Sequence, residues 1–253
     1  MIHLDHLTFG YANVSPIFSE FSWRAGRGEA WAVLGPSGCG KSTLLNLLAG
    51  LLQPSGGRVL IEGQPLERPR PHTGLIIQDY GLLPWASVRQ NAELGLRVRN
   101  FYGPDGTHAP RDYTPSLEVE PWLERLGLRD VAEHFPGQIS GGQRQRTAIA
   151  RTLALQPDLL LMDEPFSSLD APTRENLQRL MLELWAEQGL TLVTVTHAIE
   201  EAAVLGQKIL LLDTPPNRSP LVIDNPGAEQ ADYRESARYQ GVVRELRERL
   251  NRK

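Results

Sequence analysis

The feature that most constrains this chain is a glycine-rich segment between an apolar stretch and a leucine-rich stretch. In order, it reads Gly35-Pro36-Ser37-Gly38-Cys39-Gly40-Lys41-Ser42-Thr43. This order fits the pattern of a glycine, four residues and Gly-Lys-Ser/Thr. Residues 30–34 before it predict a strand, and the leucines of 44–51 predict a helix. Such a glycine-rich turn lets backbone amides and a helix N-terminus face a phosphate group. The segment therefore predicts a phosphate-binding loop that opens a helix, and a plain glycine turn is the alternative.

Three side chains of this loop predict specific chemistry. Lys41 is expected to neutralise phosphate charge, and the Ser42 hydroxyl is expected to ligate magnesium. Cys39 lies beside Lys41 and a helix N-terminus, which favours its thiolate. We therefore predict that alkylation of Cys39 inactivates the protein and that nucleotide protects it, with an inert buried thiol as the alternative.

The composition restricts the class of partner. The chain has 253 residues, a net charge of -4 and 22% charged residues, and so lacks the basic excess of nucleic-acid binders. Its single cysteine excludes an internal disulfide and a cysteine-paired zinc site, which favours a reducing compartment. No apolar run approaches the roughly 20 residues of a membrane span, and the first residues do not resemble a secretory signal. A membrane role would therefore come through a partner.

Strand-like and helix-like segments alternate along the chain. Residues 2–9 and 18–23 predict an antiparallel sheet near the N-terminus. Continuous apolar runs at 159–162, 190–195 and 209–212 are typical of strands buried on both faces of a parallel sheet. Helices are expected at 121–126, 142–156 and 233–250, the last being arginine-rich and amphipathic. Together these elements predict an α/β core.

Two acidic residues end one of the buried strands. Asp163 and Glu164 follow the apolar run 159–162, and the carboxyl ends of parallel strands form the ligand-binding edge of an open α/β sheet. Asp163 is expected to hold magnesium, directly or through water. Glu164 is expected to act as a general base on the attacking water. An acidic strand end in solvent is the alternative interpretation.

A third segment distinguishes between the classes of protein that have a phosphate-binding loop. It reads Ile139-Ser140-Gly141-Gly142-Gln143 and continues into a helix. This segment resembles the signature motif of ABC ATPases, with Ile139 where leucine is usual. The stretches 163–165 and 167–170 and then His197 resemble the next motifs of that family in the expected order. Physically, Ser140 and the amides of Gly141 and Gly142 open a helix and form a second anion-binding surface.

The resemblance implies a P-loop NTPase of the ABC ATPase fold. This fold has a mixed or parallel core sheet, an N-terminal antiparallel β-subdomain and an inserted helical subdomain. Residues 1–225 are expected to form the ATPase domain, with the helical insertion at about 79–157, and 226–253 a helical tail. ATP and Mg²⁺ are the implied cofactors. Two copies would bind head to tail, each offering Ser140, Gly141, Gly142 and Gln143 to the ATP on the other copy.

Four further positions carry weaker indications. Tyr11 is expected to stack on adenine, although a tyrosine at a sheet edge is the alternative. Gln78 follows an apolar run, and the resemblance gives it contacts with magnesium and the attacking water; a surface glutamine is the alternative. His197 follows the strand at 190–195 and is expected to contact the γ-phosphate, whereas a lone histidine is more often structural. Asp170 is expected to orient the opposite phosphate loop at the dimer interface.

One stretch indicates a subgroup. Residues 78–85 include Leu82-Leu83-Pro84-Trp85, which resembles ATPases of bacterial nitrate, sulfonate and taurine importers. Trp85 is expected at a surface where a membrane subunit docks, with a core tryptophan as the alternative. The segment 97–120 is rich in glycine and proline and predicts an extended surface loop, longer than that group usually has.

These observations predict the ATP-hydrolysing subunit of an importer at the cytoplasmic face of a membrane. The expected partners are a second copy, two transmembrane permease subunits and, indirectly, a periplasmic or extracellular solute-binding protein. No nucleic-acid partner is expected. The first alternative is a soluble ABC ATPase acting on nucleic acid or the ribosome, which the acidic charge disfavours. The second, a metabolite kinase, does not account for residues 140–143.

Overall fold

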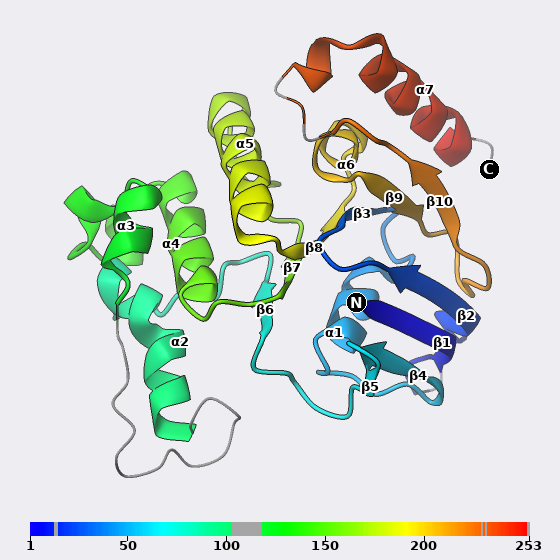
Figure 1. The fold of residues 1–253 in the computed structure, drawn as a ribbon, viewed down its shortest axis with the longest axis horizontal. Helices are drawn as coiled ribbons and strands as arrows, with labels where there is room; N and C mark the ends of the chain where they lie inside the picture. Colours follow the sequence, from blue (N-terminus) through cyan, green and yellow to red (C-terminus); the bar gives the residue numbers. More distant parts are fainter. Residues whose placement is uncertain (13–14, 103–117, 229, 231, 252–253) are drawn as a thin grey trace. The chain divides into compact units, whose positions relative to one another are not determined.

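The chain folds into two compact units (Figure 1). The structure is a computed structural model that describes residues 1–12, 15–102, 118–228, 230 and 232–251. The first unit comprises Met1–Arg70, Leu161–Glu164 and Gln178–Lys253, and the second comprises Pro71–Leu160 and Pro165–Leu177. The second unit is therefore inserted into the sequence of the first.

An antiparallel sheet forms the N-terminal part of the first unit. Its strands, in spatial order, are β2 (Phe18–Ala25), β1 (Ile2–Phe9), β4 (Gly56–Ile61) and β5 (Gln64–Pro65). In β1, Leu4 lies opposite Trp23 on one side and Val59 on the other. Buried residues alternate with more exposed ones along most of β1, because only one face of the sheet is covered. The predicted N-terminal antiparallel sheet is confirmed.

A second, mixed sheet forms the core of the first unit. Its order includes β10 (Leu221–Asp224), β9 (Lys208–Leu211), β3 (Ala30–Leu34), β8 (Thr191–Thr196) and β7 (Leu159–Asp163). β3 pairs in parallel with β8 and β9, whereas β10 is antiparallel to β9. Every residue of β3 and β8 is buried, as the continuous apolar runs predicted. The mixed core sheet agrees with the expected fold class.

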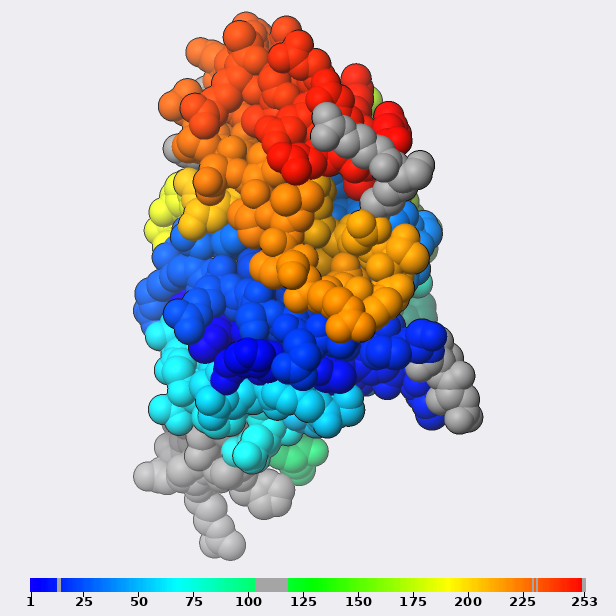
Figure 2. Space-filling model, turned by 90° about the vertical axis from the view of Figure 1, so that its right-hand side faces the viewer, coloured from blue at the N-terminus to red at the C-terminus, as the bar shows by residue number. Residues whose placement is uncertain are grey.

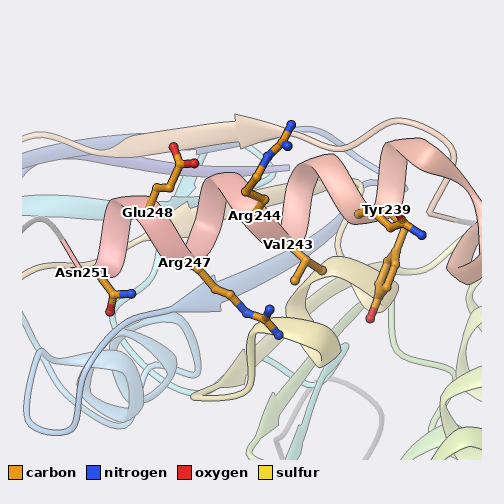
Figure 3. Close-up of a pocket in the computed structure, with 7 residues that line it drawn as sticks. Tyr239, Val243, Arg244, Arg247, Glu248 and Asn251 are labelled. Atoms are coloured by element: carbon orange, nitrogen blue, oxygen red, sulfur yellow. The ribbon is translucent and has the colours of Figure 1, made fainter.

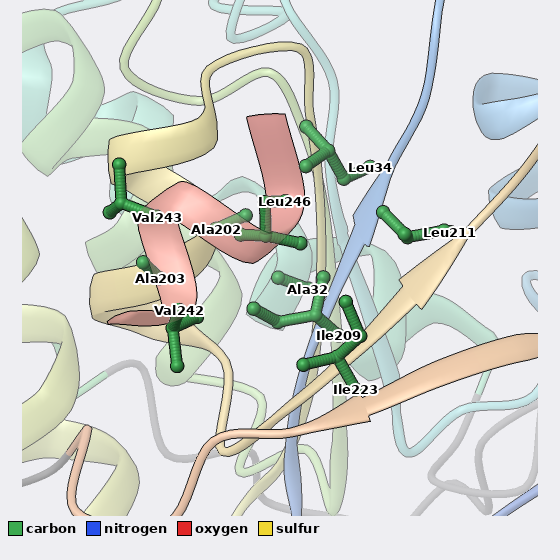
Figure 4. Close-up of a cluster of buried hydrophobic side chains, with 10 residues drawn as sticks. All are labelled: Ala32, Leu34, Ala202, Ala203, Ile209, Leu211, Ile223, Val242, Val243 and Leu246. Atoms are coloured by element: carbon green, nitrogen blue, oxygen red, sulfur yellow. The ribbon is translucent and has the colours of Figure 1, made fainter. Parts of the chain in front are cut away.

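Three helices of the first unit are α1 (Lys41–Leu48), α6 (Ile199–Leu205) and α7 (Ala237–Asn251). The predicted C-terminal helix thus begins at Ala237, after a short 3-10 turn at Tyr233–Glu235. Its apolar face is formed by Val242, Val243 and Leu246, which pack with side chains of α6, β3, β9 and β10 (Figure 4). The buried apolar area of this cluster holds α7 to the unit.

The opposite side of α7 is polar and lies at the molecular surface. Figure 2 shows this helix, in red, next to the orange segment that contains β10. Arg247 of α7 forms an ion pair with Glu200 of α6 at 2.5 Å, and both side chains are more than half exposed. Such an exposed pair contributes little to stability, so the apolar face of α7 accounts for its packing.

Helices dominate the second unit. It contains β6 (Thr73–Ile76), α2 (Val88–Tyr102), α3 (Glu120–Arg125), α4 (Gly141–Leu153), the start of β7, the first part of α5 (Ala171–Gln188) and two 3-10 turns, Arg129–Val131 and Pro136–Gln138. α4 packs against both α2 and α3. Ala148 and Ile149 of α4 are fully buried. This is the expected helical insertion, and the exact domain boundaries at 79–157 and 226–253 stay a prediction.

The surface loop predicted at 97–120 begins too early, whereas its C-terminal end agrees with the structure. α2 continues to Tyr102 and α3 begins at Glu120, while residues 103–117 lie outside the described residues. Val88, Ala92 and Leu96 are buried at the spacing of a helix face. An ion pair between Glu93 and Arg97, four residues apart at 2.7 Å, supports the same helix. The glycines and prolines farther along the segment obscured this period.

Within the described part of the chain, no helix is both long and apolar enough to cross a membrane.

Candidate functional site

The glycine-rich loop joins β3 to α1 in the first unit. Gly40 caps α1 with φ 106°, and Gly38 has φ 79°, conformations that favour glycine. A Cβ on Gly40 would lie 2.4 Å from Cγ2 of Ile17, so only glycine fits there. The loop therefore presents backbone amides and the α1 N-terminus together, which is an anion-binding arrangement.

Lys41 is held at the base of this loop. Its Nζ donates hydrogen bonds to the carbonyl oxygens of Gly35 and Pro36, both at 2.9 Å, and the residue is only 7% exposed. An ammonium has three donors. The two bonds fix the side chain across the loop and leave a third donor for an anion.

Two acidic residues lie at the end of β7. The backbone N–H of Glu164 donates to the carbonyl of Val195 in β8 at 2.9 Å, which ties the strand end to its neighbour. Burial raises the pKa of the Asp163 carboxyl, and the charge of Glu164 raises it further, whereas a hydrogen bond from Ser42 and the charge of Lys41 lower it. Oδ1 of Asp163 is buried and has no hydrogen-bond partner among the described residues. A carboxylate oxygen with this environment is suited to a cation.

Glu164 and His197 meet at the same edge of the core sheet. His197 follows β8 directly, and its Nδ1 lies 3.1 Å from Oε2 of Glu164. The Glu164 side chain is 20% exposed and the histidine ring is 58% exposed. The sequence-predicted pair is thus within hydrogen-bond distance, and its histidine is accessible to a ligand.

The phosphate loop and Glu164 line one cavity. It has a volume of about 350 Å³ and is lined by Tyr11, Ile17, Ser37, Gly38, Gly40, Lys41, Ser42, Thr43 and Glu164. The Tyr11 hydroxyl lies 3.4 Å from Oγ1 of Thr43, and its ring packs edge-on against Phe9. Tyr11 is nevertheless 48% exposed, so a face of its ring is available for stacking.

A larger cavity of about 630 Å³ runs along α7. Figure 3 shows that its labelled lining side chains, from Tyr239 to Asn251, all come from this single helix. Its lining contains no glycine-rich turn and no histidine beside a carboxylate, as Glu164 and His197 form. The candidate site is therefore the phosphate loop.

The expected signature residues begin α4 in the second unit. Oγ of Ser140 accepts a hydrogen bond from the backbone N–H of Gln143 at 3.2 Å, and Oε1 of Gln143 accepts one from the backbone N–H of Ser140 at 2.8 Å. This capping box fixes the helix start. Gly141 and Gly142 occupy the first turn, where a Cβ on Gly142 would lie 2.6 Å from the Thr173 side chain. The geometry agrees with an anion-binding helix N-terminus.

Asp170 lies at the start of α5 in the same unit. Its Oδ1 accepts a hydrogen bond from the backbone N–H of Thr173 at 3.0 Å, which also lowers the pKa of the carboxyl. This bond is a helix cap. The expected role of Asp170 at a dimer interface stays a prediction.

Gln78 follows β6 and is exposed. The next residues are braced by Arg151 of α4, which donates to the carbonyls of Tyr80 at 2.6 Å and Gly81 at 2.7 Å. The Tyr80 hydroxyl lies 2.8 Å from Oγ of Ser168. These contacts link the segment after Gln78 to α4 and to the turn before α5. No sequence pattern predicts this linkage, because it depends on contacts between residues about 70 and 88 positions apart.

Two alternatives left open by the sequence are now decided. Trp85 is 73% exposed, so it is not a core residue. Cys39 is 1% exposed, which favours the buried-thiol alternative over the expected reactive thiol. A thiol that reagents cannot reach reacts slowly whatever its neighbours.

The sequence matches the ABC transporter family over residues 18–167. Taurine import ATP-binding protein TauB of Pseudomonas aeruginosa is 45% identical over 202 residues, covering 80% of this chain and 73% of that protein. Its namesake from Yersinia pestis is 42% identical over 203 residues, covering 80% and 76%. Among solved structures, a dimeric ATP-binding cassette in a post-hydrolysis state, bound to ADP and phosphate, has a TM-score of 0.73 and 30% identity. The superposition covers 90% of this chain and 100% of that chain.

Proposed function

The chain belongs to the ABC transporter family as an ATP-binding and ATP-hydrolysing subunit, and we propose that it powers the import of taurine or a similar small sulfonate. The similarity to two taurine import proteins supports this substrate class. A soluble ABC ATPase acting on nucleic acid or the ribosome is not favoured, because these relatives are import proteins.

The cavity at the phosphate loop is the proposed ATP site. The triphosphate would lie over Gly38, Gly40 and the α1 N-terminus, with Lys41 neutralising part of its charge. Tyr11 would stack on the adenine ring, which its half-exposed position permits. The observation that carries the proposal is that Glu164 lines this same cavity, so the binding loop and a potential base share one space.

The donor atoms at the base of the cavity fit Mg²⁺. Asp163 offers a buried carboxylate oxygen, and the Ser42 hydroxyl hydrogen-bonds to the same carboxyl. No group of three or more His, Cys, Asp or Glu side chains among the described residues could hold a metal ion by itself. Mg²⁺ suits such a site, because it commonly binds one or two carboxylates together with phosphate oxygens and water. When bound, the ion supplies charge neutralisation at the phosphates.

Glu164 is the proposed general base. Its carboxylate would take a proton from the water that attacks the γ-phosphate, a role worth about 10² to 10⁴ in rate. Nδ1 of His197 at 3.1 Å from Oε2 would hold that carboxylate in place. The exposed part of the imidazole ring would face the γ-phosphate. Gln78 is proposed to contact the magnesium ion and the attacking water, the role that the resemblance to the family implies.

A second copy is proposed to complete the site. The capped N-terminus of α4, with Ser140 exposed and Gly141 half-buried, is a surface suited to a phosphate group. In a head-to-tail dimer it would bind the γ-phosphate held by the partner's phosphate loop. The dimeric state of the related cassette bound to ADP and phosphate supports a dimer of this chain.

Two membrane permease subunits are the proposed partners at the cytoplasmic face. Trp85 is 73% exposed, and Ile77 and Phe135 of the same unit are 46% and 44% exposed. Aromatic side chains such as those of Trp85 and Phe135 are enriched at protein interfaces. ATP-driven closure of the dimer would move docked permease helices, and hydrolysis would release them. A solute-binding protein outside the membrane would deliver the solute.

Uptake of labelled taurine tests the proposal. Cells lacking the gene should lose uptake, and the wild-type gene should restore it, whereas the Glu164→Gln variant should not. Trp85→Ala should reduce uptake and leave the ATPase activity of the isolated chain unchanged. Normal taurine uptake without the gene would refute the substrate assignment, and labelled nitrate in the same cells would then test the other solute of the group.

A further inference from the structure

A segment distant in sequence lies directly behind the phosphate loop. It follows β9, and the backbone N–H of Leu212 donates to the carbonyl of Leu34, the last residue of β3, at 2.9 Å. A Cβ on Gly35 would lie 2.6 Å from the carbonyl oxygen of Leu212. The chain after β9 thus touches the first residue of the loop.

Asn217 forms the main connection between this segment and the loop. Its Nδ2 donates to the carbonyl of Cys39 at 2.9 Å and to that of Ile17 at 3.3 Å, and its Oδ1 accepts from the backbone N–H of Asp213 at 2.8 Å. The residue is 5% exposed. Since two carbonyls face one end of the amide and an N–H faces the other, only one orientation of the side chain satisfies all three groups.

The backbone of Asn217 reaches the same neighbourhood. Its N–H donates to the carbonyl of Ile17 at 2.8 Å, and its carbonyl accepts from the N–H of Ser19 at 2.9 Å. The Ile17 side chain in turn lies against Gly40 and lines the nucleotide cavity. Asn217 therefore fixes two walls of the cavity, the start of β2 and the Cys39–Gly40 turn.

We propose that Asn217 is a positioning residue for the phosphate loop. It holds the carbonyl of Cys39 away from the cavity, so that the amides around Gly40 and the N-terminus of α1 point toward the phosphates. A backbone held in its binding conformation does not have to be ordered when the ligand arrives, which improves affinity. This inference rests on the proposed ATP site, and it concerns nucleotide affinity more than the chemical step.

The Asn217→Asp variant tests the role with little change in shape. A carboxylate oxygen would replace the donor that faces two carbonyls, so both hydrogen bonds are lost and like partial charges oppose each other. Loss of ordinary hydrogen bonds corresponds to about a two- to tenfold change in an equilibrium constant for each bond. We expect the Kd for ATP to rise about tenfold, with KM rising similarly and kcat remaining near the wild-type value. Asn217→Ser, whose hydroxyl is one bond shorter than the amide and does not reach either carbonyl, should also raise the Kd without adding a charge.

Asn225 provides a matched control. It is also a buried asparagine, and its Nδ2 donates to the carbonyls of Ala203 and Gly206, away from the phosphate loop. Asn225→Asp should lower the melting temperature as Asn217→Asp does and leave the Kd for ATP unchanged.

Titration of the purified full chain with a fluorescent ATP analogue, below the melting temperature of each variant, measures these affinities. Wild-type affinity in folded Asn217→Asp and Asn217→Ser would overturn the inference. An equal loss in Asn225→Asp would overturn it as well, because it would indicate a general effect of destabilisation. Failure of the wild type itself to bind the analogue would instead reject the proposed ATP site.

Discussion

Replacing Leu246 with alanine tests how the C-terminal helix is attached. Leu246 is fully buried and lies in a cluster with residues of α6, β3, β9 and β10. Leucine-to-alanine changes in cores cost about 2–5 kcal/mol, and the value is lower where the surroundings relax into the space. α7 has a solvent-exposed side and can shift inward, so we expect about 2–3 kcal/mol. For a chain of this size, each kcal/mol lowers the melting temperature by about 2–4 °C.

Thermal unfolding followed by circular dichroism measures this effect, with Arg247→Ala as the matched control one residue away. Arg247 contributes an exposed ion pair, and its loss should cost less than about 0.5 kcal/mol. Neither residue lines the nucleotide cavity, so ATP affinity should be unchanged in both variants. If the Leu246→Ala and Arg247→Ala proteins had the same melting temperature, the packing of α7 through Leu246 would be refuted.

Two further outcomes follow from the buried groups of the site. Because burial raises the pKa of Asp163, its contribution to folding stability is fully present below the pKa of the unfolded chain and is lost as the pH rises through the folded pKa. Asp163→Asn should therefore stabilise the nucleotide-free protein at neutral pH, measured by urea unfolding, while Mg²⁺-dependent ATP hydrolysis is lost; a destabilised variant would contradict this. Because Cys39 is buried, a thiol reagent should label it slowly with or without ATP and rapidly after denaturation, and fast labelling of the native protein would contradict the structure.

The residues of the candidate site at the phosphate loop could be located from the sequence, because the motifs that mark them are made of residues close together in the chain. The phosphate loop combines a glycine order with a preceding strand and a following helix, and all three parts lie within residues 30–51. The place of Asp163 and His197 at one sheet edge could be predicted because each follows an apolar run, and parallel strands bring their ends to one edge. The structure adds the 3.1 Å contact between Glu164 and His197, which no spacing in the sequence specifies.

The residues that brace the site were not predictable in this way. Asn217 contacts Cys39 across 178 positions, and Arg151 contacts Gly81 across 70. Their partners are backbone carbonyls, which carry no sequence pattern. Helix α2 was not predicted for a different reason, because Gly95 and the glycines and prolines beyond Tyr102 masked its helical period. Burial of Cys39 depends equally on chain segments that are distant in sequence.

Glu164 is proposed to act as the base for ATP hydrolysis in a dimer of this chain. The Glu164→Gln variant tests it most directly, because it removes the base and keeps the shape of the side chain. With ATP and Mg²⁺, we expect turnover to fall by at least about 100-fold and light scattering to give twice the monomer mass. Undiminished turnover would contradict the role of Glu164 as the base. A mass that stays that of a monomer in ATP would contradict the ATP-bound dimer.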